Sequence, residues 1–263
     1  MSLVFDKHTE ELYRAWQLSS PGRSIEKELE KVFVKLLSPQ KGERVLDIGC
    51  GAGNHLLFLN KLGLDITGID ASPYMISLAG KRLGHRCTLK TGLAEDLPFD
   101  DNEFDLAVLI HTLEFLDDPL QALREAGRVA KRNVFIGVIN GLSWQIFPDK
   151  LKGLFKETIS RYSRSYTLWE LKSYIRKAYG HVPVSWQSER VWPSFLDRLC
   201  GFFSDGWSLK SCPFGSFLGI AATIRYTVKT NNLPLKIRVE KAEPSSIAEG
   251  ITTMGDPKYT VNQ

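Results

Sequence analysis

Short aliphatic runs alternate with amphipathic stretches along the chain from residue 43 to about residue 140. The runs have the length and the β-branched composition of buried strands, whereas the stretches between them repeat apolar residues at helical spacing. This alternation predicts an α/β fold in which helices cover both faces of a mainly parallel sheet. We expect strands at 44–48, 65–70, 87–91, 104–109 and 134–139, and helices at 54–62, 73–83 and 119–129.

Two blocks flank this alternating region. Residues 1–40 contain two segments with apolar residues at helical spacing. Trp16 belongs to the first segment and Leu29 to the second, and Pro21-Gly22 separates them. This periodicity predicts an N-terminal extension of two helices. After residue 140 the pattern predicts helices at 144–156 and 168–177 and strands at 182–189 and 217–229.

The composition is that of an ordinary folded protein. Of the 263 residues, 43% are hydrophobic and 24% are charged, which excludes a wholly disordered or fibrous chain. The apolar runs are far shorter than the roughly 20 residues that span a bilayer, and the acidic start, with Asp6, Glu10 and Glu11, is unlike a signal peptide. The sequence therefore predicts a cytoplasmic protein without a transmembrane segment.

Charge and cysteines limit the partners further. A net charge of +4 is too small to indicate nucleic-acid binding by itself. The cysteines Cys50, Cys87, Cys200 and Cys212 show neither closely spaced pairs nor a nearby histidine pattern. We therefore expect free thiols, and the sequence predicts neither a disulfide framework nor a metal site.

The most informative segment is a glycine-rich turn that directly follows the first predicted strand. Its glycines stand at alternate positions, Gly49, Gly51 and Gly53, and a helix follows. Glycines allow positive φ and a close approach of backbone N–H groups to a ligand. The next strand ends in Asp70, 17 residues beyond Gly53, where a carboxylate could accept both hydroxyls of a ribose. Together they predict a site for an adenosine-containing cofactor.

Two cofactor classes compete for this site. A dinucleotide fingerprint needs Gly-x-Gly-x-x-Gly, and the alternate spacing disfavours a dehydrogenase. Asp-Ile-Gly-Cys-Gly-Ala-Gly at 47–53 instead resembles the first motif of class I S-adenosylmethionine-dependent methyltransferases. The resemblance continues through Gly-Ile-Asp-Ala-Ser-Pro-Tyr-Met at 68–75, the acidic segment 94–105 and Leu-Glu-Phe-Leu-Asp-Asp-Pro at 113–119, so it covers about residues 40–140.

The resemblance implies a role for individual residues at S-adenosylmethionine. The loop backbone would meet the methionine part, with Asp47 near its ammonium group, while Asp70 would hold the ribose. Ala71 and Met75 would pack on the adenine, which Ala94 and Glu95 would recognise. The full set implied at the cofactor is Asp47, Gly49, Cys50, Gly51, Gly53, Asp70, Ala71, Met75, Ala94, Glu95 and Ile110.

The chain departs from the family pattern at two places. Leu93 stands where relatives usually have an acid after the glycine that matches Gly92, which moves the adenine contact to Glu95, Asp96 or the backbone. The Pro-Gly-Gly turn common in relatives before the fifth strand is replaced by residues 130–133, which should alter that turn and leave the chemistry unaffected.

The segment after the fourth strand, 109–114, would project towards the transferred methyl group. It lacks the Asn/Asp-Pro-Pro-Tyr sequence with which enzymes grip adenine or glutamine amide nitrogens, so those acceptors are disfavoured. His111 is the best candidate base, because imidazole titrates near neutral pH; the alternative is a histidine that only lines the pocket. Glu114 could act as an acid-base group or bind an amine, but a structural role is favoured. No dedicated catalytic residue is required, since transfer mainly needs alignment and exclusion of water.

Aromatic residues gather outside the cofactor core, in the N-terminal helix, after the fifth strand and at 190–207. In relatives the N-terminal helix and the segment between the sixth and seventh strands cover the acceptor, so we expect a pocket for a small apolar or aromatic molecule. The residues expected at the substrate or lid are Tyr13, Trp16, His111, Glu114, Asn140 and Trp144. The basic stretch 149–180 is interpreted as a solvated helix face; an anionic substrate, a membrane surface or RNA is the alternative.

The resemblance implies a Rossmann-like, seven-stranded, mainly parallel sheet whose last strand is antiparallel, as in the superfamily. Its expected parts are a helical lid (1–40), an S-adenosylmethionine-binding core (41–140), a completion of the sheet with substrate-covering insertions (141–235) and a mobile tail (236–263). The expected activity is methyl transfer to an oxygen, nitrogen or carbon atom of a small molecule. An RNA or protein methyltransferase and a non-enzymatic cofactor sensor or partner subunit are the alternatives.

Overall fold

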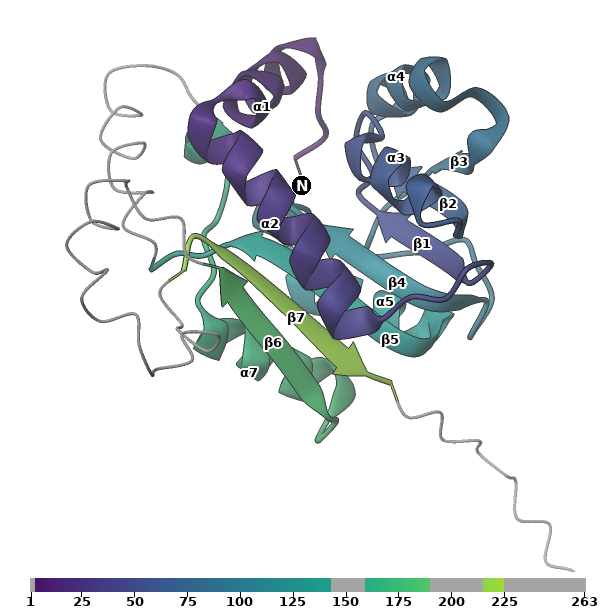
Figure 1. The fold of residues 1–263 in the computed structure, drawn as a ribbon, viewed down its shortest axis with the longest axis vertical. Coiled ribbons are helices and arrows are strands. Elements are labelled where there is room, and N and C mark those ends of the chain that lie inside the picture. Colours follow the sequence, from purple (N-terminus) through teal and green to yellow (C-terminus); the bar gives the residue numbers. More distant parts are fainter. Residues whose placement is uncertain (1–2, 143–158, 190–214, 225–263) are drawn as a thin grey trace, which may run out of the picture. The chain divides into compact units, whose positions relative to one another are not determined.

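A single seven-stranded sheet organises the protein. The computed structural model describes residues 3–142, 159–189 and 215–224, all of which belong to one compact unit, Met1–Tyr226. The strand order is β3-β2-β1-β4-β5-β7-β6 (Figure 1). Strands β1 to β5 are parallel, and β7 runs antiparallel to both β5 and β6. The strands are β1 Arg44–Ile48, β2 Asp65–Asp70, β3 Thr88–Thr91, β4 Phe104–Ile110, β5 Ala130–Ile139, β6 Val184–Glu189 and β7 Phe217–Thr223.

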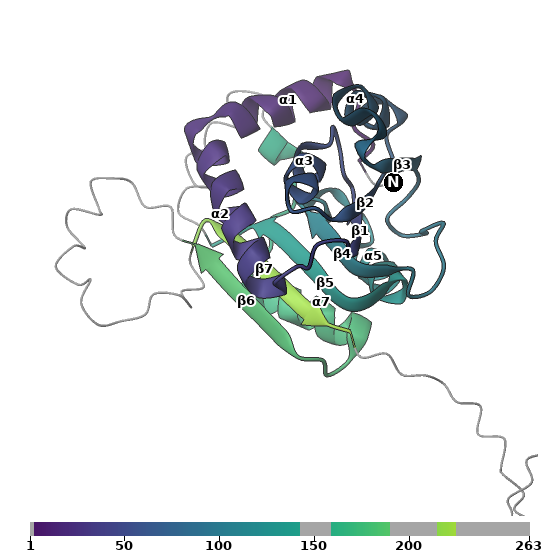
Figure 2. The ribbon, with the colours of Figure 1, turned by 45° about the vertical axis from the view of Figure 1, so that its right-hand side comes forward.

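Helices cover both faces of this sheet, which confirms the predicted fold class. One face packs on α2, α3 and α4, and the opposite face packs on α5 and α7 (Figures 1 and 2). The helices are α1 Lys7–Leu18, α2 Ser20–Leu37, α3 Asn54–Lys61, α4 Pro73–Leu83, α5 Pro119–Val129 and α7 Leu168–Tyr179, with single 3₁₀ turns at Gly84–Arg86, Leu113–Phe115 and Ile159–Arg161. None of the described helices is both long and apolar enough to cross a membrane.

Local sequence signals explain where several helices begin. Ser72 accepts a hydrogen bond from the Met75 N–H at the start of α4, and Asp118 accepts one from the Gln121 N–H at the start of α5. In both helices proline follows the capping residue, where its missing N–H costs nothing. Thr167 caps α7 with a reciprocal capping box. These caps fix the helix starts at the positions that the sequence predicted for α4, α5 and α7.

The corner between α1 and α2 differs from the prediction. The sequence placed the break at Pro21-Gly22, but α1 ends at Leu18 and Ser19 caps α2, so both residues lie inside the first turn of α2. Proline fits this turn because its φ suits a helix start. A Cβ on Gly22 would clash with the Trp16 carbonyl oxygen, so glycine allows the two helices to meet closely.

The fifth strand is longer than predicted. Residues 130–133 were expected to form a turn, yet they are the first residues of β5, and Ala130 pairs with Phe104 of β4. The strand begins directly where α5 ends, so no separate turn is needed there. Strand β6 begins two residues later than predicted because Pro183 has no N–H to donate to a neighbouring strand.

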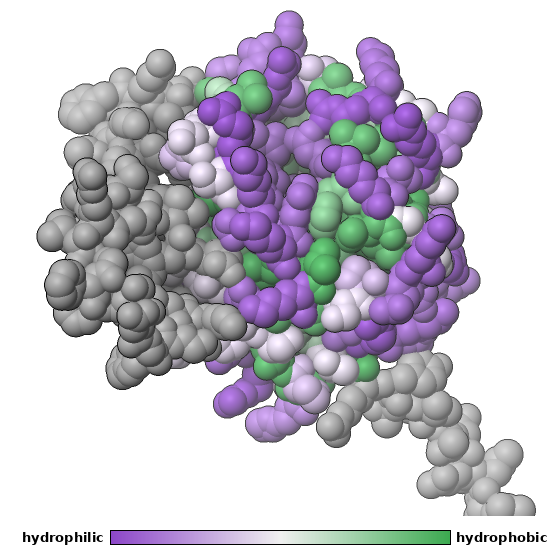
Figure 3. All heavy atoms as spheres, in the orientation of Figure 1, coloured by the Kyte–Doolittle hydropathy of each residue, from purple (hydrophilic) through white to green (hydrophobic). Residues whose placement is uncertain are grey.

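Packing gives α2 two distinct sides. Its buried side carries Ile25, Leu29, Val32 and Phe33, which join the core under the sheet. Figure 3 shows hydrophilic side chains over the outer surface of this helix and hydrophobic ones beside it. This amphipathic pattern is the one expected of a helix that covers a sheet.

Several predictions concern residues outside those described. These are the helix at 144–156 with Trp144, the aromatic segment 190–207, the end of the last predicted strand at 225–229 and the mobile tail at 236–263. The division of the chain at residues 40, 140 and 235 also stays a prediction.

Candidate functional site

A cavity of about 220 Å³ lies beyond the carboxyl ends of β1, β2 and β4, with α1 over it. This is the position at which ligands bind in open parallel sheets. The cavity brings together most residues that the sequence placed at the cofactor: Gly49, Cys50, Gly51, Asp70, Ala71, Met75, Ala94, Glu95 and Ile110. Tyr13 and His111 also line it, whereas Asp47, Gly53, Trp16, Glu114 and Asn140 are not among its lining residues.

The three loop glycines all have positive φ, at +75°, +53° and +81°, but they serve different purposes. A Cβ on Gly49 would clash with the Thr112 side chain, and one on Gly53 would lie 2.5 Å from Leu83 Cδ1. A Cβ on Gly51 would meet no atom within 4 Å. Gly49 and Gly53 therefore permit tight packing of the loop, while Gly51 exposes backbone to the cavity.

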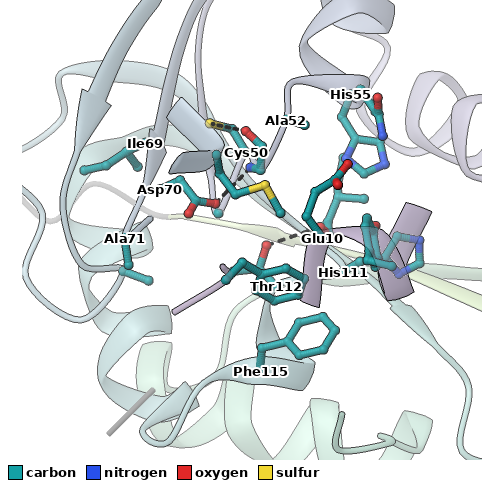
Figure 4. A pocket seen from close by; sticks show the side chains of 18 of the residues that line it. Glu10, Cys50, Ala52, His55, Ile69, Asp70, Ala71, His111, Thr112 and Phe115 are labelled. Atoms are coloured by element: carbon teal, nitrogen blue, oxygen red, sulfur yellow. Dashed lines mark hydrogen bonds between the residues drawn. The ribbon is translucent and has the colours of Figure 1, made fainter. Parts of the chain in front are cut away.

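Asp70 is held in place at the end of β2. Its Oδ2 accepts a hydrogen bond from the Gly51 N–H (2.9 Å), and its Oδ1 accepts one from the Ser72 N–H (2.8 Å). Burial raises the pKa of Asp70, while these two backbone hydrogen bonds oppose the rise. The backbone N–H groups of Gly51 and Ser72 therefore orient the Asp70 carboxylate. Its remaining lone pairs are available to a ligand in the cavity (Figure 4).

Asp47 lies behind the glycine loop and is fully buried. Neither of its carboxylate oxygens has a hydrogen-bond partner among the described residues. Burial raises its pKa to about 7; nearby His55 lowers the pKa and Asp70 raises it. An uncompensated buried carboxylate is costly, and a cation bound nearby would relieve that cost. Asp47 therefore fits the neighbourhood of a cofactor that carries an ammonium group.

His111 follows β4 and is the most unusual polar residue of the cavity. Its φ is +52°, and its ring is almost entirely buried. Neither ring nitrogen has a hydrogen-bond partner among the described residues, although Nδ1 lies 3.5 Å from Glu114 Oε1. The Trp16 ring packs edge-on against the imidazole, with 5.5 Å between ring centroids. An imidazole in this position can exchange a proton with a ligand in the cavity, or it can coordinate a ligand.

A second histidine reaches the same part of the cavity from α3. His55 Nε2 lies 3.0 Å from Glu26 Oε2 of α2. Burial alone would raise the pKa of Glu26, but the charges of His55 and His111 and hydrogen bonds lower it to about 2. Burial alone would lower the pKa of His55, and its pairing with Glu26 raises it. Neither Glu26 nor His55 was predicted at the site from the sequence, where each is only one of the polar residues of its helix.

Aromatic residues close the cavity beneath α1. Phe5 packs edge-on against Phe115 and Tyr13, with 5.0 and 6.0 Å between ring centroids. The Ser72 hydroxyl donates to the Phe5 carbonyl oxygen (2.5 Å), which ties the segment before α1 to the end of β2. Burial raises the pKa of Tyr13 well above its usual value, so its phenol stays neutral.

Glu114 and Asn140 make structural hydrogen bonds beside the cavity. Glu114 Oε1 accepts from the Ile139 N–H (3.0 Å), and Asn140 Nδ2 donates to the Gly215 carbonyl oxygen (2.8 Å). These bonds join the turn after β4 to the end of β5 and to the segment before β7. Their substrate role stays a prediction.

The strand order, the glycine loop and the acid that ends β2 define a Rossmann-like domain of the methyltransferase type. A family model described as a methyltransferase domain matches residues 46–137. This match and the similar proteins below support assignment of the chain to the class I S-adenosylmethionine-dependent methyltransferase superfamily, with S-adenosylmethionine as the cofactor.

Individual relatives resemble the chain at moderate identity. A demethylmenaquinone methyltransferase from Listeria welshimeri is 29% identical over 182 residues, covering 66% of this chain and 74% of the relative. An ajmaline N-methyltransferase from Rauvolfia serpentina is 29% identical over 213 residues, covering 76% and 71%. A solved structure from Thermotoga maritima, described as a possible histamine N-methyltransferase, is 27% identical with a TM-score of 0.61, covering 83% and 97%.

Proposed function

We propose that this enzyme transfers the methyl group of S-adenosylmethionine to a small, apolar or aromatic acceptor. The observation that carries the proposal is the cavity, which is lined both by the glycine loop and by aromatic residues under α1. The relatives named for demethylmenaquinone and ajmaline support an acceptor of this size.

The cofactor end has the groups that S-adenosylmethionine requires. The exposed backbone at Gly51 would meet the methionine part, Asp70 would accept the ribose hydroxyls, and Ala71 and Met75 would contact the adenine. When bound, the cofactor supplies an electrophilic methyl group on a sulfonium. Asp47 would stabilise the ammonium group through space, which in turn would compensate its own buried charge.

The acceptor would lie against His111, Tyr13 and Phe115, which line the same cavity. The aromatic rings would hold the acceptor and exclude water, which favours transfer between a sulfonium and a neutral acceptor. His111 would assist removal of the acceptor's proton, because its ring nitrogens are not engaged by other described residues. Thr112 Oγ1 donates to the Ile48 carbonyl oxygen (2.8 Å) and thereby fixes the turn that carries His111.

The charge of the cavity favours a small molecule over a polynucleotide. Its charged lining residues are the acids Glu10, Asp70 and Glu95 and the bases Arg14 and Arg82. A site that binds RNA needs a surplus of positive charge along the phosphate backbone. No such surplus is found among the residues that line this cavity.

A labelling experiment tests the proposal. The purified chain is incubated with S-adenosylmethionine labelled in its methyl group and with separate fractions of small metabolites, RNA and protein. We expect label in the small-metabolite fraction, where mass spectrometry then identifies the acceptor. Label confined to RNA or to protein would refute the proposed acceptor class and leave the methyltransferase assignment intact.

A further inference from the structure

We propose that Glu26, His55 and His111 bind one divalent transition-metal ion at the acceptor end of the cavity. Each residue offers one donor atom, and the three donor atoms lie within 4.8 Å of one another. Two imidazoles and one carboxylate form a donor set that suits Zn²⁺ and related first-row ions. The residues come from α2, α3 and the end of β4, so only the folded chain brings them together.

The distances are close to those of a loaded site. Donor atoms bound about 2.1 Å from one ion lie about 3.4 Å apart in a tetrahedral arrangement. His55 Nε2 and Glu26 Oε2, at 3.0 Å, already have such a spacing. A movement of about 1 Å would bring the His111 ring to the same ion, given these bond lengths.

The ion pair between Glu26 and His55 does not explain why His111 is buried beside them. Glu26 and His55 satisfy one another, but His111 is 5% exposed and neither of its ring nitrogens has a hydrogen-bond partner among the described residues. Burying an imidazole without partners costs free energy. Its left-handed backbone, at φ +52°, is a second cost for a residue other than glycine. A bound ion would supply the missing partner.

The surroundings match those of a histidine that holds a metal. Metal-bound imidazoles usually pair their second ring nitrogen with a carboxylate or carbonyl group. Glu114 Oε1 lies 3.5 Å from His111 Nδ1, which leaves Nε2 as the nitrogen for the ion. The Ile139 N–H holds this carboxylate in place. Glu114 is thus a positioning residue for the proposed site.

The proposed metal site opens into the cavity in which the acceptor would bind. His55 and His111 both line the cavity, and they lie on the same side of it (Figure 4), with 5.9 Å between ring centroids. Three protein donors leave a coordination position open to a ligand in the cavity. On the proposed function, an acceptor oxygen or nitrogen atom would bind there, and the ion would lower the pKa of that atom so that its proton is released to solvent before methyl transfer. His111 would then act as a ligand of the ion.

Metal titration tests this proposal without any acceptor. The untagged full-length chain is stripped with a chelator, and Zn²⁺ is titrated by calorimetry, followed by Co²⁺ with visible absorption. We expect one ion per chain and cobalt bands free of a thiolate charge-transfer signal. Glu26→Gln, His55→Asn and His111→Asn should each weaken Zn²⁺ binding about 100-fold or more, because each removes a ligand.

His85→Asn is the matched control, since His85 is exposed in the Gly84–Arg86 turn; it should bind Zn²⁺ as the unmodified chain does. Circular dichroism and binding of S-adenosylhomocysteine verify that each variant is folded. Should a variant fail to fold, NMR of the cobalt-loaded, unmodified chain replaces it: two paramagnetically shifted imidazole N–H signals are expected. Absence of Zn²⁺ binding, binding unaffected by the three substitutions, or fewer than two such signals would overturn the proposal. These results would leave the acceptor class untouched.

Discussion

The two ends of the cavity are built in different ways. The cofactor end consists largely of backbone, namely the loop 49–53 and the end of β2, and its one oriented carboxylate is held by N–H groups of the same segments. The proposed acceptor end consists of side chains from α1, α3 and the turn after β4, and Glu26 of α2 lies beside His55 and His111. A backbone site needs particular residues at fixed spacing, whereas a side-chain site can be assembled from any segments that the fold brings together.

Because the two ends are built differently, we expect one end to determine cofactor affinity and the other to determine turnover. The proposed cofactor site is formed by the loop after β1 and the end of β2, so it is tied to these two strands of the sheet. The acceptor end depends on α1 and on single positions such as His55 and His111, which can change without disturbing the sheet. We therefore expect substitutions at one end to alter cofactor affinity and substitutions at the other to alter turnover.

The largest expected effect is at Asp70. Asp70→Ala removes up to two charge-assisted hydrogen bonds to the ribose and should weaken S-adenosylmethionine binding by about 2–4 kcal/mol, after allowance for non-additivity. Calorimetry measures the change. Asp65→Ala, at the exposed start of the same strand, is the control and should bind normally. Equal affinities in folded Asp70→Ala and in the unmodified chain would remove Asp70 from the cofactor site.

At the opposite end, His111→Asn should lower turnover about 100-fold and leave cofactor affinity nearly unchanged. Asparagine tolerates the left-handed backbone at this position, so the variant should fold. The assay uses the acceptor found by the labelling experiment. A loss of turnover below tenfold would show that His111 only lines the cavity. A parallel loss of cofactor affinity would contradict the expectation that the two ends control affinity and turnover separately.

Asp47 links stability to pH. Its pKa is raised to about 7 in the folded protein from an ordinary value of 3.8, so the folded state binds the proton more tightly than the unfolded state. The resulting stability is fully present below about pH 4 and is lost as pH rises through 7, by up to about 4 kcal/mol at roughly 1.4 kcal/mol per pKa unit. Asp47→Asn should remove this pH dependence.

Denaturant unfolding at pH 5 and pH 8, with chelator present, measures the effect. Asp47→Asn should be more stable than the unmodified chain at pH 8, whereas the exposed control Asp65→Asn should change little. S-adenosylmethionine should reduce the difference, because its ammonium group compensates the charge of Asp47. If Asp47→Asn were less stable than the unmodified chain at pH 8, a buried, uncompensated carboxylate would be the wrong description.

The smallest expected effect concerns α1. Deleting residues 1–18 removes the cavity wall that includes Phe5 and Tyr13 but keeps Ser19, the cap of α2. The sheet should stay folded, and S-adenosylhomocysteine should dissociate about tenfold faster, as expected when a cover that limits release is lost. Stopped-flow fluorescence measures this rate. Unchanged dissociation would show that α1 is only structural; if the deletion unfolds the chain, Phe5→Ala and Tyr13→Ala repeat the test.

Most of the residues expected at the cofactor could be brought to one cavity by sequence reasoning alone because their signals are local. Periodicity located β1 and β2, and the chirality of the backbone restricts positive φ mainly to glycine, which made Gly49, Gly51 and Gly53 conspicuous. The error at residues 130–133 arose because a turn was assumed where α5 leads directly into β5. The error at Pro21-Gly22 arose because proline marks the start of a helix as readily as its end.

The acceptor end could not be predicted in the same way. Glu26 and His55 lie on helices whose apolar positions determine packing, and nothing in their spacing indicates that they meet. His111 was noticed only because it follows β4. Contacts between segments distant in sequence depend on how α2 and α3 pack on the sheet, which hydrophobic periodicity does not specify.

The contact between S-adenosylmethionine and the loop at Gly51 tests the placement of the cofactor most directly. Calorimetric titration with S-adenosylhomocysteine should give one site per chain, and NAD should not bind. Gly51→Ala should weaken binding about tenfold or more, equivalent to about 1.4 kcal/mol, because its Cβ would point into open cavity. Gly42→Ala carries the same backbone strain, at φ +86°, away from the cavity, and should bind normally. Equal affinities for both variants would contradict the placement of the cofactor at this loop.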